Sequence, residues 1–241
     1  MSHTGRGPLR GPDPVLRAAA AHVFVEDLDS DPLVVGTDDE HHLYRVLRLR
    51  PGQAVTACDG NGRWRPCRLG AGSLLPDGEV VEQARPRPAI TVAFSLAKGD
   101  RTDWAVQKLT ELGVDRMVPL LAERTVVVWD HSKADRHRQR WTRISREAAA
   151  QARLVRLPVV EAPTPVPDLL SRLGPSACAA EPGGEMPGLD HPAVLVGPEG
   201  GWGPDELPEG LHRVGAGPTV LRTETAAVAL GAALSLARAL G

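Results

Sequence analysis

The chain has 241 residues, 42% of them hydrophobic and 24% charged, with a formal net charge of −2, which is typical of a globular protein with a hydrophobic core. No apolar stretch approaches the roughly 18 residues of a membrane span, and prolines interrupt the basic start, so neither a membrane span nor a signal peptide is predicted. Cys58, Cys67 and Cys178 are too scattered for a disulfide framework or a zinc site, which indicates a reduced, cytoplasmic protein without a metal.

Short apolar segments separated by turns make up the chain to about residue 83. The dipeptides Asp59-Gly60 and Asn61-Gly62 lie between two such segments and predict a β-hairpin. Strands with turns at such short intervals indicate a small β-barrel or sandwich. The segments expected to hold these strands are residues 22–28, 32–36, 53–69 and 78–84.

One helix is predicted among these strands, over residues 38–52. Acidic residues occupy its start, Leu43, Val46 and Leu47 share one face, and a Pro-Gly pair ends it. Beyond it, two prolines within residues 84–89 predict a stiff linker. We therefore expect one domain over residues 1–84 and a second over residues 89–241.

Longer apolar runs that alternate with helical segments follow the linker. Residues 101–113 are predicted to be a helix with Thr102 as N-cap, Val106 and Leu109 facing inward, and Gly113 just after the C-cap. This alternation indicates an α/β domain with a mostly parallel sheet, in which ligands bind at the carboxyl ends of the strands. The predicted strands are 89–97, 114–122, 157–162, 176–181, 192–197 and 211–217, and the other helices are 133–156, 166–174 and 223–240.

Charge is unevenly distributed along the chain. Residues 41–70 hold six arginines against Asp59 alone, and residues 132–156 hold eight lysines and arginines against two acids. Two basic blocks in a nearly neutral chain indicate either a local contact with a polyanion or ordinary solvated surfaces. Charge alone does not separate these two interpretations.

Two turns rich in glycine and proline follow apolar runs near the end of the chain, GPEGG at residues 197–201 and AGPTVLRT at residues 216–223. A Walker-type phosphate loop needs a lysine, which GPEGG lacks, and Glu199 would repel a phosphate. Residues 89–103 do not resemble a dinucleotide fingerprint, and G-x-S-x-G and H-E-x-x-H motifs are absent. The GPEGG turn therefore either forms part of a pocket for a cationic or neutral ligand or is a plain turn before a helix.

VGPEGGWGPDEL together with GPTVLRTETAAVAL resembles the paired signature of the RsmE-type RNA methyltransferases of the SPOUT superfamily. HHLYRVLRLRPGQAV, AKGDRTDWAVQKLTELGV and RWTRISREAAAQARLVRLPVV resemble other parts of the same family. The resemblance implies an N-terminal PUA-like small β-barrel that binds RNA, followed by a SPOUT α/β domain with a C-terminal deep trefoil knot. It further implies that a homodimer uses S-adenosylmethionine to methylate N3 of a uridine in 16S ribosomal RNA of the small subunit.

In this family the loops of the knot form the cofactor pocket. The matching loops here lie around residues 180–181, 197–201 and 216–223. The resemblance implies that backbone groups hold the adenine and that a carboxylate lies near the sulfonium. The implied cofactor-binding residues are Ala180, Glu181, Val196, Gly197, Gly200, Gly201, Gly215, Ala216, Pro218, Leu221, Arg222, Thr223 and Thr225.

Arg222 and Glu199 are the candidate catalytic residues. Methylation of N3 requires the uracil to lose its proton, and a guanidinium at the start of the last helix would stabilise the resulting anion. The alternative is that Arg222 pairs with Glu199 or Glu224 and only braces the fold. Thr223 and Thr225 are candidates for helix caps as well as for ligand contacts.

RNA contacts are predicted for arginines in both domains: Arg45, Arg48, Arg63, Arg65, Arg124, Arg153 and Arg156. Such contacts position the RNA and give salt dependence rather than base choice. Trp202 either stacks on a base or anchors its loop. Two departures put some contacts in doubt: His22 stands where the family usually has an arginine, and residues 150–154 read AQARL where it often has Glu-Gln-Ser/Cys-Gly-Arg.

Two other functions are compatible with the same features. One is a SPOUT methyltransferase that acts on another RNA, because the divergent N-terminal region determines the substrate. The other is a non-catalytic RNA-binding factor in ribosome assembly that has kept the knot and lost turnover.

Overall fold

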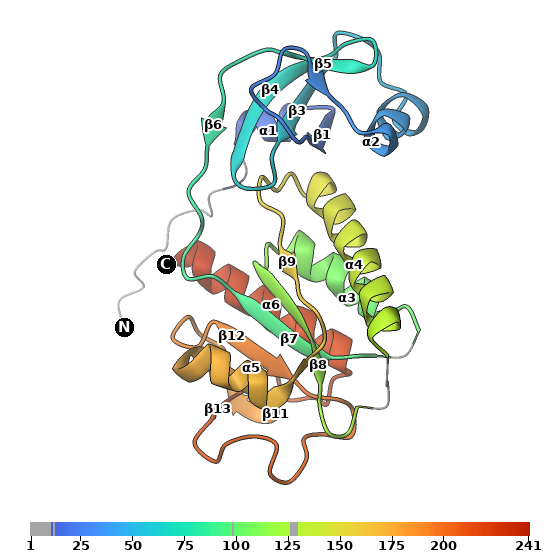
Figure 1. The fold of residues 1–241 in the computed structure, drawn as a ribbon. Coiled ribbons are helices and arrows are strands. Elements are labelled where there is room, and N and C mark those ends of the chain that lie inside the picture. The colour runs from blue at the N-terminus through green and yellow to red at the C-terminus, as the bar shows by residue number, and fades with distance from the viewer. Residues whose placement is uncertain (1–10, 12, 98, 126–129) are drawn as a thin grey trace, which may run out of the picture. The chain divides into compact units, whose positions relative to one another are not determined.

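The computed structural model describes residues 11, 13–97, 99–125 and 130–241. Its contacts group the described residues into two compact units, and Figure 1 labels most of their helices and strands. Of the described residues, the N-terminal unit comprises those up to Arg85 together with Arg146–Leu157, and the C-terminal unit comprises those within Pro86–Ser145 and Pro158–Gly241. One change of unit therefore falls in the predicted linker, and another falls inside a helix. The assignment of domains to residues 1–84 and 89–241 stays a prediction.

The N-terminal unit contains a sheet with strand order β1-β3-β4-β5-β2, and β6 pairs with β4. β1 runs parallel to β3, and the other neighbours are antiparallel. The hairpin prediction is confirmed, because β3 and β4 pair up to Cys58↔Trp64 on either side of the turn. The sequence analysis did not predict β5 or α1. The elements are α1 Pro14–Ala18, β1 Ala21–Phe24, β2 Leu33–Val34, β3 Ala54–Cys58, β4 Arg63–Leu69, β5 Ser73–Pro76 and β6 Val81–Glu82.

The helix predicted over residues 38–52 is shorter and changes type. α2 spans Thr37–His41 and continues as a π-helix over His42–Val46. Leu43 is fully buried as expected, but Val46 and Leu47 are 57% and 41% exposed, so the predicted inward face is wrong for these two. The π-turn accounts for the difference, because bonds such as that from Leu47 N to His42 O hold more residues per turn than an α-helix.

Apolar side chains cover both faces of the N-terminal sheet. Val23 and Val55 belong to one buried cluster, whereas Phe24 belongs to another, because successive side chains of a strand point to opposite faces. Ala149 and Val155, from the separate segment Arg146–Leu157, complete the second cluster. The core of this unit is thus built from two distant stretches of the chain.

A parallel sheet forms the centre of the C-terminal unit, in the order β10-β8-β7-β12-β11-β13 with β9 beside β8. The prediction of an α/β fold with a mostly parallel sheet is confirmed. Because all these strands point the same way, the loops that follow β11, β12 and β13 emerge at one edge. The strands are β7 Thr91–Ser95, β8 Arg116–Leu121, β9 Val159–Val160, β10 Thr164–Pro165, β11 Ala177–Glu185, β12 Ala193–Val196 and β13 His212–Val214.

Helices cover both faces of the parallel sheet (Figure 1). Val92 and Phe94 of β7 pack in a cluster with residues of α3, α4 and α6, whereas Ala93 packs with residues of α5. Gly231 lets α6 approach α3 closely, because a Cβ there would lie 2.6 Å from Leu109 Cδ2. No helix in the described ranges is long and apolar enough to cross a membrane. The helices are α3 Arg101–Glu111, α4 His131–Gln151, α5 Val166–Leu173 and α6 Thr223–Leu240.

The bounds predicted for α6, 223–240, are confirmed, whereas α3 and α4 agree with the prediction only in part. Gly113 follows the C-cap of α3 with a φ of 74°, as predicted. Asp100 occupies the N-cap position of α3, so the prediction for Thr102 is wrong; the Thr102 hydroxyl instead bonds the main chain of Ala97. α4 ends at Gln151 rather than at residue 156, because Arg153 adopts a left-handed φ of 59° that a helix cannot continue.

Candidate functional site

A pocket of about 400 Å³ lies at the edge of the parallel sheet where β11, β12 and β13 end. A cavity of this size suits a small-molecule ligand. The predicted cofactor-binding residues that line it are Ala180, Glu181, Val196, Gly197, Gly201, Ala216, Leu221 and Thr223. Those outside its lining are Gly200, Gly215, Pro218, Arg222 and Thr225. Lining residues that the sequence analysis did not propose as ligand contacts include Thr219, Val220, Ala226 and Leu230.

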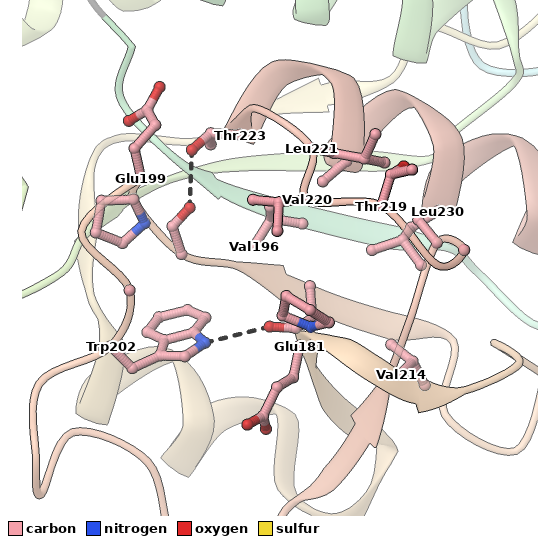
Figure 2. A pocket seen from close by; sticks show the side chains of 18 residues that line it. Glu181, Val196, Glu199, Trp202, Val214, Thr219, Val220, Leu221, Thr223 and Leu230 are labelled. Atoms are coloured by element: carbon pink, nitrogen blue, oxygen red, sulfur yellow. Dashed lines mark hydrogen bonds between the residues drawn. The ribbon is translucent and has the colours of Figure 1, made fainter.

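Trp202 joins two walls of this pocket. Its indole Nε1 donates a hydrogen bond of 3.3 Å to the carbonyl of Ala180, drawn as a dashed line in Figure 2. A Cβ on Gly197 would lie 2.9 to 3.1 Å from atoms of the indole ring, so glycine is needed to leave room for it. These contacts favour the loop-anchor interpretation of Trp202 over base stacking.

The remaining wall is fixed by close main-chain and hydroxyl contacts. The Thr223 hydroxyl, at the start of α6, donates to the carbonyl of Gly197 at 2.9 Å (Figure 2). The amide of Gly215 donates to the carbonyl of Glu185, and a Cβ on Gly184 would lie only 2.5 Å from the carbonyl carbon of Val214. β11 was predicted to end at residue 181, but it continues to Glu185. Its pairing with β13 shifts register between Ala180 and Glu185.

Both acidic side chains of the pocket lining form ion pairs. Glu181 lies 3.4 Å from Arg213, and Glu199 lies 3.6 Å from Arg101. Figure 2 shows both carboxylates directed away from the pocket interior. No lysine, arginine or histidine is among the described residues that line the pocket, and no cluster of described histidine, cysteine or acidic residues could hold a metal ion.

Arg222 occupies the N-cap position of α6 with an exposed side chain. In the part of the chain that the structure describes, it pairs with neither Glu199 nor Glu224, the two partners considered from the sequence. Arg101 lies beside both carboxylates instead, at 3.6 Å and 3.7 Å. Arg101 belongs to the AKGDRTDW segment, but the sequence analysis missed it because its acidic partners are remote in sequence.

The arginines proposed for RNA contacts differ in how free their guanidinium groups are. Arg45 and Arg48 are exposed and have no hydrogen bond or ion pair with any described residue. The others donate to nearby oxygens: Arg63 to Asp29, Arg65 to Leu28 and Gly78, Arg124 to Gly200, Arg153 to Ala19, and Arg156 to Asn61 and Gln83. Arg45 and Arg48 are therefore the most available of the set for phosphate contacts.

His22 is buried in the N-terminal unit rather than exposed at an RNA surface. Its ring nitrogens lie 2.8 Å from the Thr56 hydroxyl and 3.1 Å from both the Leu154 carbonyl and the Cys58 sulfur. Burial is the main cause that lowers the pKa of His22 to about 4, so the ring is neutral at pH 7. Leu154 belongs to the second departure from the family, so the two departures pack against each other.

The chain matches two family models, an RNA methyltransferase domain over residues 84–235 and an RNA methyltransferase PUA domain over residues 36–74. It is 36% identical over 224 residues to ribosomal RNA small subunit methyltransferase E of Mycobacterium tuberculosis, covering 83% of this chain and 84% of that relative. The Bacillus subtilis protein of the same name is 30% identical over 227 residues, covering 83% and 89%.

A solved structure is similar in fold as well. Ribosomal RNA small subunit methyltransferase E from Neisseria gonorrhoeae, bound to S-adenosyl methionine, gives a TM-score of 0.71 at 27% identity and covers 88% of this chain and 95% of its own. The matched RNA methyltransferase domain includes the whole pocket. This chain therefore belongs to the RsmE-type family of RNA methyltransferases.

Proposed function

We propose that this protein transfers the methyl group of S-adenosylmethionine to N3 of a uridine in 16S ribosomal RNA of the small subunit. The observation that carries the proposal is the pocket at the carboxyl ends of β11, β12 and β13, the usual ligand position in an α/β sheet. The cofactor in the gonococcal structure and the names of the relatives support it. A ribosomal substrate implies a cytoplasmic protein.

The pocket lining fits a cationic cofactor. No basic side chain is among the described lining residues, so none of them would repel a sulfonium. Glycines at positions 197, 201 and 217 leave backbone groups accessible to an adenine and a ribose. Bound S-adenosylmethionine would supply the methyl group, and the protein would position the uracil and assist the loss of its N3 proton.

We also infer that the C-terminal part of the chain forms a deep trefoil knot and that the protein is a homodimer. The adjacent strands β12, β11 and β13, whose loops meet α6 at one pocket, support the knot. α6 supports the dimer, because residues 226–234 are all apolar or glycine and Leu236 beyond them is 50% exposed. Neither a membrane nor a metal enters the proposal.

RNA binding is assigned first to Arg45 and Arg48, whose guanidinium groups are unshared among the described residues. They lie in the segment matched by the PUA model, which supports an RNA-binding role for the N-terminal unit. Phosphate contacts of this kind would make the affinity for RNA fall as the salt concentration rises. Arg63, Arg65, Arg124, Arg153 and Arg156 remain secondary candidates, because their present partners would have to be exchanged for phosphate.

Replacing Arg222 by alanine is expected to reduce methylation by a factor on the order of 10² to 10³ while changing cofactor affinity little. The guanidinium lies outside the pocket lining, so cofactor contacts are retained, whereas stabilisation of the uracil anion at the start of α6 is lost. Transfer of labelled methyl groups to 16S ribosomal RNA and calorimetry with S-adenosylmethionine measure the two quantities. If methylation and cofactor affinity fall equally, Arg222 has a structural role instead.

The same two measurements on Glu199→Gln test the second catalytic candidate.

The function itself is tested by mass mapping of 16S ribosomal RNA nucleosides from wild-type and deletion strains. The expected result is the loss of one 3-methyluridine in the deletion strain. If that nucleoside persists and a methyl group disappears from another RNA, the enzyme has a different target. If the purified dimer does not bind S-adenosylmethionine, a non-catalytic RNA-binding factor in ribosome assembly becomes the better interpretation.

A further inference from the structure

A charged cluster at the edge of the pocket joins three elements of the C-terminal unit. Arg101 is the first residue of α3, Glu199 lies in the loop after β12, and Glu224 lies in the first turn of α6. Arg101 Nη1 is 3.6 Å from Glu199 Oε1 and 3.7 Å from Glu224 Oε1. One guanidinium thus connects a wall of the pocket to two helices.

Glu224 is the fixed end of this cluster. Its side chain is 9% exposed, and its second oxygen, Oε2, is buried without a hydrogen-bond partner among the described residues. A buried carboxylate is costly unless a cation or a helix N-terminus compensates it, and Glu224 has Arg101 on one side and the first turn of α6 on the other. Glu224 therefore holds the Arg101 guanidinium against the first turn of α6.

Glu199 is the exposed end. Its side chain is 51% exposed, it lines the pocket, and Figure 2 shows its carboxylate at the pocket edge on the side of Thr223. Without Arg101, the Glu199 carboxylate would be uncompensated at the pocket edge, and Glu224 would keep only the first turn of α6 as a compensating group. Glu199 would also face an RNA backbone of the same charge, and like charges brought together at an interface are strongly unfavourable.

We propose that Arg101 is a positioning residue of the methyl-transfer site: it holds the Glu199 carboxylate at the pocket edge and neutralises it so that RNA can approach. This inference rests on the proposed function, because it takes a polyanionic substrate at this edge. An unpaired Glu199 carboxylate would repel RNA but attract the positively charged sulfonium of the cofactor. Removal of Arg101 should therefore affect the two ligands differently, whereas general damage to the pocket would weaken both.

The test measures the affinity for a 16S ribosomal RNA transcript and for S-adenosylmethionine, and the kcat and KM of methylation, at one salt concentration. Arg101→Ala is expected to raise the Kd and the KM for RNA on the order of tenfold without weakening cofactor binding. Arg101→Lys should recover most of the RNA affinity, because it keeps the charge. Arg101→Ala combined with Glu199→Gln should recover it too, because the uncompensated carboxylate is gone.

Arg172→Ala is the matched control, because it removes an exposed arginine from an ion pair with Glu161 in the same unit and lies outside both basic blocks. The proposal is overturned if Arg101→Ala behaves like this control, if cofactor and RNA binding fall equally, or if Glu199→Gln rescues nothing. A wild-type protein that binds the RNA without methylating it would instead contradict the proposed function. The RNA affinities of the variants would then still decide the role of Arg101.

Discussion

Gly197→Ala is expected to lower the affinity for S-adenosylmethionine by about tenfold or more. The new Cβ would lie 2.9 to 3.1 Å from the Trp202 ring, so the indole must move and its bond to the Ala180 carbonyl is strained or lost. Overpacking of this kind typically costs roughly 1–3 kcal/mol, which corresponds to a factor of about five to 150 in binding if the pocket wall shifts. Calorimetric titration of the variant with S-adenosylmethionine measures the effect.

Gly210→Ala is the matched control for this variant. Gly210 belongs to the same unit, and a Cβ there would meet no atom within 4 Å. Its cofactor affinity should equal that of the wild type. Unchanged affinity in Gly197→Ala as well would contradict the assignment of Trp202 as the residue that holds the pocket walls together.

Acid is expected to destabilise the protein through His22 by up to roughly 3 kcal/mol. The folded-state pKa of about 4 lies below the ordinary histidine pKa of 6.5, so the unfolded chain binds the proton more readily. The free energy of unfolding should therefore be intact above about pH 6.5, fall as the pH drops towards 4, and lose nothing further to this residue below that.

Urea unfolding of the wild type and of His22→Gln between pH 4 and pH 8 separates this effect from the titration of carboxylates. Glutamine does not titrate and keeps hydrogen-bonding groups for Thr56 and the Leu154 carbonyl, so the variant should lack the His22 part of the decline. The difference between the two curves, rather than either curve alone, isolates His22. Two parallel curves would show that His22 is not the group responsible.

The fold was largely predictable because its signals are local. Val106 and Leu109 recur at helical spacing and are buried, and the glycine-rich turn after Cys58 does connect two paired strands. One error arose where an α-helix changes into a π-helix, because the extra residue in the turn changes which side chains face the core. A π-turn exposes Val46 and Leu47, and no simple periodicity predicts such a turn.

The site was predictable in its loops and much less so in its side-chain contacts. Glycine and proline indicate where the chain turns, so the loops around Gly197 and Ala216 could be placed at strand ends and do line one pocket. The partner of Glu199 could not be found in this way, because Arg101 meets it only through the folding of distant segments. His22 was considered only as a missing RNA contact, because its burial depends on Leu154, far along the chain.

Because the segment Arg146–Leu157 belongs to the N-terminal unit, that unit cannot be expressed or exchanged intact as one continuous piece of the chain. A fragment that ends at Arg85 carries all the strands of the N-terminal sheet but lacks Ala149 and Val155, so the cluster around Phe24 is left open to water. A chimera that exchanges the N-terminal unit between relatives would need to exchange both stretches, the second of which begins inside α4 at Arg146 and ends at Leu157. The N-terminal unit of this protein is therefore encoded by two separate stretches of the gene rather than by one N-terminal block.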